Sequence, residues 1–465
     1  MEDGAVCTPQ NQKNNTPRRV PVFEPEGNSR KYSEIMKKIE SHLECVRCHK
    51  TYDLSQVRYK CDCGGTLDLR HDLEHLDGAE LKARWEKRWG ARHGLDRSGV
   101  WRYRELIFDA PVECIVSRQE GNTRLYEAGK AGEYAGLKRF YLKHEGENPT
   151  GSFKDRGMTC GATAAKFYGA KVVACASTGN TSASMASYAV TGGMKSVIFI
   201  PEGKIAYGKL AQALAFGGKT LQIRGNFDDA MKLVQEVCSE LNIYLLNSIN
   251  PFRIEGQKAI GFEVLQQLDW QVPDWFVIPG GNLGNNSALS KGLEELYTLG
   301  IIDKIPRIAV IQAAGSAPLA KMWKEHTPFA PVLNPETIAT AIKIGNPVSY
   351  EKSLRGLKWS NGVVESVTEQ EIMDAKAMVD AAGIGAEPAS CCSVAGAKKL
   401  VDAGVIDPEA TVVGILTGNI LKDPDAVIGY HQDTLLEHYG IRGTYANKPV
   451  VIDPTLAAVK AALAN

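Results

Sequence analysis

The stretch ENPTGSFKDRGMT, residues 147–159, places a lysine at the point where a helix is expected to begin. Pro149 and Gly151 predict a turn just before Lys154. The N-terminal end of a helix disfavours an ammonium group, and burial in a cleft also lowers the pKa of a lysine. Both effects favour the free amine that a nucleophilic lysine needs. From this stretch alone, a surface lysine paired with Asp155 is the alternative.

Around this stretch, from about residue 139 to 420, strand-like apolar runs alternate with helical patterns. Such alternation predicts parallel sheets that are covered by helices on both faces. There are too many units for one small sheet, so we expect an α/β fold of two lobes with a cleft between them; a barrel is the competing arrangement. The predicted strands are RFYLKHE, KVVACAS, SVIFIPE, KTLQIRG, YLLNSIN, WFVIPGG, RIAVIQAAG and TVVGILTGN, and four predicted helices are GMTCGATAAKFYG, TSASMASYAVTGG, IAYGKLAQALAFG and FDDAMKLVQEVCSEL.

The loops that follow the strands are the candidate site, because open α/β sheets bind ligands beyond the carboxyl ends of their strands. ASTGNTSAS offers hydroxyls, an amide and backbone N–H groups that suit a carboxylate. IPGGNLGNNSA lets the backbone close around an anion at a helix N-terminus, which suits a single phosphate monoester. A simple tight turn is the alternative for that glycine-rich loop. ILTGNILKDP ends a strand with the hydroxyl of Thr417.

These loops together meet the requirements of one cofactor. Pyridoxal phosphate needs a lysine, a cup for its phosphate and a partner for its ring nitrogen. A neutral hydroxyl at that nitrogen leaves the ring unprotonated and therefore a weaker electron sink, which suits eliminations at Cβ and Cγ.

A second feature is the cysteine cluster in CVRCHKTYDLSQVRYKCDCGG. Cys45 and Cys48 form a CxxC pair, and Cys61 and Cys63 form a CxC pair. Two such turns held face to face predict a tetrahedral site of four sulfurs for a structural zinc ion. The alternative is a small β-hairpin with reduced or vestigial cysteines.

Composition limits the remaining possibilities. Of 465 residues, 54 are Lys or Arg and 54 are Asp or Glu, and this balance argues against nucleic acid as the main partner. The sequence has no run of about 18 apolar residues, so no membrane span is expected. The N-terminal stretch lacks the apolar core of a signal peptide. The 11 cysteines are odd in number and unevenly spread, which favours a reducing compartment, with the cytoplasm as the default.

ENPTGSFKDRGM, STGNTSAS, PGGNLGN and LTGNILKDP, in this order, resemble the threonine synthases, in the tryptophan-synthase-β group of pyridoxal-phosphate enzymes. The resemblance covers about residues 110–425. It implies the two-lobed α/β architecture of fold type II with parallel sheets, preceded by a cysteine-rich, zinc-ribbon-like knuckle, and it suggests a homodimer. Asn419 departs from the family pattern, which often has a histidine there, and the chain beyond about residue 430 carries no motif that we can assign.

The resemblance assigns roles residue by residue. Lys154 would bind the cofactor and act as general base, Asn180 would bond the cofactor 3′-oxygen, and Thr417 would face the ring nitrogen. The cofactor-binding residues that it implies are Lys154, Asn180, Gly281, Asn282, Leu283, Gly284, Asn285 and Thr417.

The implied reaction converts O-phospho-L-homoserine and water to L-threonine and phosphate, so a second anion site is needed for the substrate. NSINPFRIEGQK, which follows a predicted strand, supplies candidates, among which Arg253 suits bidentate binding of phosphate; a salt bridge at a helix start is its alternative. The predicted substrate-binding residues are Ser177, Thr178, Thr181, Asn247, Ser248, Asn250, Arg253 and Lys258.

Three rival functions stay open at this point. A dehydratase acting on threonine or serine would share the cofactor residues, and a cysteate-synthase-like enzyme would also use a phosphorylated substrate. A non-enzymatic zinc-ribbon interaction protein is the third. The predicted organisation is a disordered tail (1–40), a zinc-ribbon-like knuckle of four cysteines (41–75), a larger cofactor-binding lobe (76–157 and 266–440), a smaller α/β lobe (158–265) and a C-terminal extension (441–465).

Overall fold

The computed structural model describes residues 40–464, apart from 203–206 and 226. The predicted disordered tail, residues 1–40, therefore lies outside the described residues except for its last position. No helix within the described part of the chain has the length and apolar character needed to cross a membrane.

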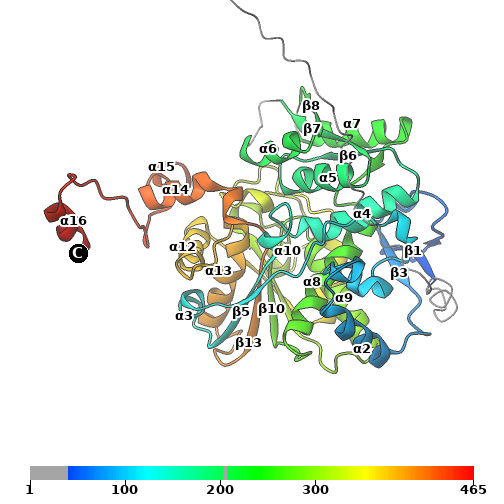
Figure 1. Ribbon diagram of the computed structural model, residues 1–465, viewed down its shortest axis with the longest axis horizontal. Helices are drawn as coiled ribbons and strands as arrows, with labels where there is room; N and C mark the ends of the chain where they lie inside the picture. Colours follow the sequence, from blue (N-terminus) through cyan, green and yellow to red (C-terminus); the bar gives the residue numbers. More distant parts are fainter. Residues whose placement is uncertain (1–39, 203–206, 226, 465) are drawn as a thin grey trace, which may run out of the picture. The chain divides into compact units, whose positions relative to one another are not determined.

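The largest sheet has six strands in the order β12-β11-β10-β13-β5-β4, and every neighbouring pair is parallel except β4 with β5. Figure 1 labels three of them, β5, β13 and β10. The predicted runs RFYLKHE, WFVIPGG, RIAVIQAAG and TVVGILTGN are confirmed as four of its strands. The two strands that were not predicted, β4 and β12, lie at its two edges. The strands are β4 (Leu125–Glu127), β5 (Arg139–His144), β10 (Trp275–Pro279), β11 (Arg307–Ala313), β12 (Val363–Val367) and β13 (Thr411–Leu416).

The second sheet has four parallel strands in the order β8-β7-β6-β9. All four were predicted, and they lie between residues 158 and 265, where the smaller lobe was expected. Both large sheets nonetheless belong to one compact unit, Ile39–Asn465, so the predicted lobe boundaries stay a prediction. The strands are β6 (Val172–Ala176), β7 (Lys195–Pro201), β8 (Lys219–Ile223) and β9 (Tyr244–Leu245).

Helices cover both faces of the six-stranded sheet because its strands are apolar on both sides. Side chains alternate along β10: Val277 belongs to the same buried core as residues of α12 and α13, whereas Phe276 and Ile278 belong to the core that holds residues of α8 and α9. Because the side chains on both faces of these strands are buried, the strands are nearly continuous apolar runs. The four helices predicted by pattern, α4 to α7, are confirmed. The helices are α2 (Gly78–Trp89), α3 (Lys130–Ala135), α4 (Lys154–Phe167), α5 (Asn180–Thr191), α6 (Tyr207–Ala215), α7 (Phe227–Glu240), α8 (Pro251–Gln267), α9 (Gly284–Thr298), α10 (Pro318–Glu325), α11 (Tyr350–Trp359), α12 (Glu369–Ala381), α13 (Pro388–Asp402), α14 (Pro424–Gln432), α15 (Leu436–Tyr439) and α16 (Leu456–Leu463).

A third, antiparallel sheet holds the cysteine cluster and has the strand order β2-β1-β3. Its inward side chains Leu43, Leu67 and Leu69 are fully buried in the same apolar core as the helices α8 and α9. The knuckle is therefore packed into the body of the protein and is not a separate module. Its strands are β1 (Ser41–Cys45), β2 (Thr51–Tyr52) and β3 (Leu67–His71).

Candidate active site

The sheet order brings three of the predicted loops together. β10, β13 and β5 are consecutive parallel strands, so their carboxyl ends meet at one edge of the sheet. The glycine loop follows β10, Thr417 follows β13, and the lysine loop follows β5. In the smaller sheet, β6 and β9 are also neighbours, so the loops at residues 177–180 and 247–250 adjoin each other.

Backbone hydrogen bonds join the lysine loop to the loop after β13. The amide of Phe153 donates to the carbonyl of Thr417 at 3.0 Å, and the amide of Asn419 donates to the carbonyl of Gly151 at 2.9 Å. Both bonds are made by residues just before Lys154, so they fix the start of α4 relative to Thr417.

Lys154 is the first residue of α4, as the sequence predicted. Burial lowers the pKa of its amine to about 7; the positive charge of Arg253 lowers it further, and the carboxylate of Glu387 opposes this. The neighbouring Asp155 is fully buried and accepts hydrogen bonds at 2.6 Å from the hydroxyls of Thr150 and Ser184. No ion pair joins Lys154 to Asp155 among the described residues, so the alternative of a paired surface lysine is wrong.

The hydroxyl of Thr417 is buried beside that of Ser390, with their oxygens 3.1 Å apart. Ser390 lies in the first turn of α13, and its hydroxyl also accepts from the amide of Gly418 at 2.9 Å. This second hydroxyl was not predicted, because nothing in the run EPAS distinguishes it from an ordinary helix start.

The glycine loop folds tightly at the start of α9. Leu283 has φ 62°, a left-handed conformation that is costly for a branched side chain, and it immediately precedes the helix. A Cβ on Gly281 would lie 3.1 Å from the Cα of Ile342, so a larger residue would press on that backbone. The loop is thus narrow, with the backbone N–H groups of a helix N-terminus available at its rim.

Several buried polar atoms around these loops have no hydrogen-bond partner within the described residues. They include the hydroxyl of Ser152, Oδ1 of Asn180, and both amide atoms of Asn285. Buried polar atoms are rarely left unpaired, so their grouping beside Lys154 and the glycine loop indicates a polar ligand. A phosphate, a ring oxygen and an aldehyde that reacts with an amine satisfy this set, so the residues fit pyridoxal phosphate.

Glu387 is a further residue that sequence reasoning missed. Its buried carboxylate accepts from Nδ2 of Asn180 at 3.2 Å and lies against the backbone of Gly418. It therefore connects the Asn180 loop of the smaller sheet to the loop after β13. A lone glutamate before a proline carries no signal that would have revealed this role.

Arg253 provides a buried positive charge next to Lys154. Its side chain is 2% exposed, Nη1 donates to the carbonyl of Leu246 at 3.0 Å, and Nε has no partner within the described residues. Burial lowers the pKa of its guanidinium to about 10. No carboxylate of the described chain forms an ion pair with it, so the alternative of a salt bridge at the helix start is wrong.

Other predicted substrate residues have partners in the protein. Asn247 bonds both backbone atoms of Ala176, at 2.9 and 3.0 Å, and Asn250 caps α8 by accepting from the amide of Phe252. Both asparagines thus stabilise the ends of β6 and α8.

Lys258 lies away from the candidate site in a buried cluster of charges. Its ammonium is 2.6 Å from Glu255 and 2.7 Å from Glu295, and it is fully buried. Its spacing from Arg253 predicted that the two residues lie on one helix, and α8 carries both. The ammonium of Lys258 is, however, already neutralised by the carboxylates of Glu255 and Glu295.

The remaining predicted residues line the loop after β6. Ser177, Thr178 and Thr181 are half-buried, and the hydroxyl of Ser177 accepts from the amide of Gly179 at 3.2 Å. The loop precedes α5, whose N-terminal N–H groups suit a carboxylate.

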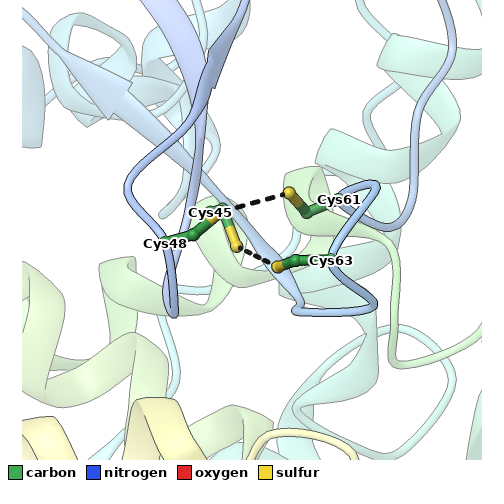
Figure 2. Close-up of side chains that lie close together, drawn as sticks. All are labelled: Cys45, Cys48, Cys61 and Cys63. Atoms are coloured by element: carbon green, nitrogen blue, oxygen red, sulfur yellow. Dashed lines mark hydrogen bonds between the residues drawn. The ribbon is translucent and has the colours of Figure 1, made fainter.

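The four cysteines of the knuckle converge, as Figure 2 shows. The sulfurs of Cys45 and Cys63 are 3.5 Å apart, as are those of Cys48 and Cys61, and all four lie within 4.8 Å of one another. Zinc–sulfur bonds of about 2.3 Å in a tetrahedron place sulfurs about 3.8 Å apart, so the cluster fits a zinc ion.

A family model described as pyridoxal-phosphate dependent enzyme matches residues 116–418, which is more than half of the chain. The chain belongs to this family. The match spans all the loops described above, from the lysine loop to Thr417.

Curated relatives of this pyridoxal-phosphate dependent enzyme are named threonine synthase. The protein of Methanocaldococcus jannaschii is 48% identical over 83% of this chain and 93% of its own length. That of Methanosarcina acetivorans is 47% identical over 91% of this chain and 98% of its own length.

Solved structures support the fold. Threonine synthase from Escherichia coli superposes with a TM-score of 0.65 over 91% of this chain and 99% of its own, at 18% identity. The processed form of threonine deaminase isoform 2 from Solanum lycopersicum gives a TM-score of 0.57 over 69% of this chain and 84% of its own, at 21% identity. At these identities the likeness concerns the fold alone.

Proposed function

We propose that this pyridoxal-phosphate dependent enzyme is a threonine synthase, which converts O-phospho-L-homoserine and water to L-threonine and phosphate. The threonine synthases at 47–48% identity over most of both chains support this function. The observation that carries the choice of substrate is Arg253, a buried cation without a carboxylate partner in the described chain, next to Lys154. A deaminase of unphosphorylated amino acids needs no such second anion site.

Lys154 is the proton carrier in this proposal. Its amine has a pKa of about 7, so at neutral pH it can both take a proton from the substrate Cα and return one later. Pyridoxal phosphate, when bound, supplies the electron sink that makes this Cα proton acidic. The glycine loop from Gly281 to Asn285 would hold the cofactor phosphate, Asn180 its ring oxygen, and Thr417 its ring nitrogen.

Two groups of residues would bind and orient the substrate. Arg253 and Ser248 would hold its phosphate, because a guanidinium binds phosphate with two parallel hydrogen bonds. Ser177, Thr178 and Thr181, at the N-terminus of α5, would hold its carboxylate.

The test is a paired assay of the full chain supplied with pyridoxal phosphate. With O-phospho-L-homoserine, equal amounts of phosphate and L-threonine should form; with O-phosphoserine and sulfite, or with L-threonine alone, turnover should be negligible. Preferred turnover of phosphoserine with sulfite, or deamination of threonine, would replace the proposal by one of its rivals. Lys154→Ala should abolish threonine formation and serves as the blank.

We also propose that the knuckle binds one structural zinc ion through Cys45, Cys48, Cys61 and Cys63. The hydroxyl of Tyr52 lies 3.1 Å from the sulfur of Cys61, and the amide of Arg47 donates to the sulfur of Cys45 at 3.4 Å. Both contacts would stabilise the thiolates that bind the ion. Four protein ligands leave no open position, so the ion would have no catalytic role.

The proposed assembly is a homodimer, and the proposed location is the cytoplasm. The ten cysteines of the described chain are all free thiols, which suits a reducing compartment. Light scattering during size-exclusion chromatography measures the assembly directly: a mass near twice the 50.6 kDa of one chain supports the dimer, and a mass of one chain contradicts it.

A further inference from the structure

A cavity of about 300 Å³ lies outside the candidate active site. It opens between the end of α2 and the loop that precedes β4, and none of its lining residues belongs to the cofactor or substrate loops. Its volume is at the lower end of the range for small-molecule pockets. The lining residues are Trp89, Ala91, Arg97, Arg102, Gln119 and Asn122.

Arg102 contributes a buried guanidinium to this cavity. The residue is 1% exposed, and its guanidinium donates to Oε1 of Gln266, at 3.2 Å from Nη1, to Oδ1 of Asn122 and to the hydroxyl of Tyr103. Its Nε has no partner within the described residues. A buried cation is costly unless an anion is close, and no carboxylate of the described chain forms an ion pair with Arg102.

The carboxylate whose pKa the charge of Arg102 helps to lower, Glu263, is already bound by other cations. Glu263 feels the charge of Arg102, but Lys143 at 2.6 Å and Arg156 at 2.8 Å bind it directly. Arg156 in turn binds Glu145 at 2.7 Å. Of Lys143, Arg156 and Arg102, only Arg102 has no ion pair with a described residue. Arg97, at the exposed rim of the cavity, has none with a described residue either.

The wall opposite α2 is a strained loop that is held in place. Gln119, Gly121 and Asn122 all have positive φ, of 58°, 82° and 52°. The amide of Gly121 donates to Oδ1 of Asn148 at 2.9 Å, and the amide of Asn122 donates to Oε2 of Glu263 at 2.8 Å. Such strain persists only where the surroundings enforce it, so the cavity is formed before any ligand arrives.

Trp89 adds a flat apolar surface at the mouth. Its side chain is 39% exposed, and its ring centroid lies 5.4 Å from the guanidinium carbon of Arg102. We propose that this cavity is a binding site for a small anion in which an oxyanion, carboxylate or phosphate, is joined to a flat group. The oxyanion lies between Arg102 and Arg97, and the flat group lies against Trp89.

The proposal does not depend on the proposed enzymatic activity, because the two sites share no residue. The test is calorimetric titration of the full-length, cofactor-loaded protein with phenyl phosphate and with benzoate, which present the two oxyanions on the same ring. Benzyl alcohol is the uncharged control. Saturable binding of at least one anion is expected, together with none of the alcohol; the tighter of the two anions identifies the oxyanion class.

Variants then locate the binding. Arg102→Met should weaken it at least tenfold, and Arg97→Met, at the exposed rim where folding is not at risk, should weaken it at least threefold. Arg224→Met, a surface change elsewhere, should leave it unchanged. Arg253→Met separates this site from the active site, because only binding at the active site would be lost in that variant.

Two results would overturn the proposal. One is the absence of saturable binding of both anions. The other is binding that survives in both Arg97→Met and Arg102→Met, or that disappears in Arg253→Met alone.

Discussion

Lys154 and Arg253 are two like charges, and the buried guanidinium of Arg253 acts on the amine of Lys154. Neither has a carboxylate bound to it among the described residues, and Glu387 influences Lys154 only through its field. The guanidinium therefore makes the ammonium of Lys154 harder to keep protonated, and burial alone accounts for the lowered pKa of Arg253. Because lysine gives up its proton far more easily than arginine, Lys154 becomes the free amine and Arg253 stays the cation.

The first prediction concerns the amine of Lys154. In the cofactor-free protein, its reactivity toward acetic anhydride should rise with pH, with a midpoint of about 7, and level off one unit or so above it. The reason is that only the free amine reacts, and burial together with Arg253 lowers its pKa. Peptide mass spectrometry after brief labelling at each pH measures this curve.

Arg253→Met provides the matched test of the cause, since removing the like charge should move the midpoint of Lys154 to higher pH. Arg224→Met, at a side chain that is 92% exposed, should leave it in place. A reactivity that still climbs tenfold per pH unit at pH 9, as for an ordinary lysine with a pKa of about 10.4, would contradict the proposed environment.

The second prediction concerns substrate binding. Arg253→Met should lower kcat/KM for O-phospho-L-homoserine by about 100-fold, because two charge-assisted hydrogen bonds to phosphate are lost. Steady-state kinetics with the purified variant measure it, with Arg224→Met as the control. An unchanged kcat/KM would remove Arg253 from the phosphate site.

At this scale, sequence could predict the residues whose chemistry is rare. A lysine at a helix start and a glycine loop after a strand have few structural uses, so Lys154 and Gly281 could be proposed from the sequence, and the structure places them at a helix start and after a strand as expected. Asn247 and Asn250 were less predictable, because a short amide after a strand caps a helix as readily as it binds a ligand. Lys258 was misassigned, since its partner Glu295 lies 37 residues away in the chain and only the fold brings the two together.

Three elements, β3, α8 and α9, are joined by one buried network of charges. Glu255 on α8 accepts from His71 of β3 at 3.0 Å, from Lys258 at 2.6 Å, and from Lys291 of α9. Both lysines, together with the hydrogen bond from His71, hold the pKa of Glu255 well below its usual range. The network fixes α8, which carries Arg253, against α9, which begins at the glycine loop.

The third prediction follows from this network. Glu255→Gln should destabilise the protein by about 3–5 kcal/mol, because two buried ammonium groups lose their shared carboxylate. Denaturant unfolding monitored by circular dichroism measures the free energy of unfolding. Glu240→Gln, the same change at the exposed end of α7, is the control and should change it by less than about 0.5 kcal/mol; a similar small effect at Glu255 would contradict the account.

Which elements could be predicted follows from where they lie in the sheets. Central strands covered on both faces are nearly continuous apolar runs, and these were recognised, as were the edge strands β8 and β9. β12 and β4 are edge strands; VVESV carries Glu365 and Ser366, and LYE is three residues long, so neither shows the pattern of a buried strand. The polar residues of β12 and the shortness of β4, both of which a sheet edge tolerates, are the physical reason for the two omissions.

On the scale of the whole molecule, the knuckle and the enzyme body share one core. Leu67 and Leu69 of β3 are fully buried in it, and Asp68 between them binds Lys352 of α11 at 2.7 Å. Loss of the knuckle's structure would therefore expose apolar surface and a buried carboxylate in the body. The cysteine cluster thus stabilises the same unit that carries the active site.

The fourth prediction concerns zinc. The purified protein should contain one zinc ion per chain, and Cys48→Ser should release it and lower the Tm of the whole chain by about 5 °C or more. Elemental analysis and calorimetry measure the two effects. Cys114→Ser, a free thiol outside the cluster, should retain both zinc and Tm; zinc-free wild-type protein of unchanged Tm after metal addition would contradict the zinc site.

The most direct measurement of the central claim is the point of attachment of the cofactor. The protein is loaded with pyridoxal phosphate, reduced with borohydride to make the linkage permanent, digested, and examined by mass spectrometry. The account predicts that the cofactor mass lies on Lys154 alone, in protein whose unreduced form makes threonine from O-phospho-L-homoserine. Attachment to a different lysine, or none in protein that is active, would contradict it.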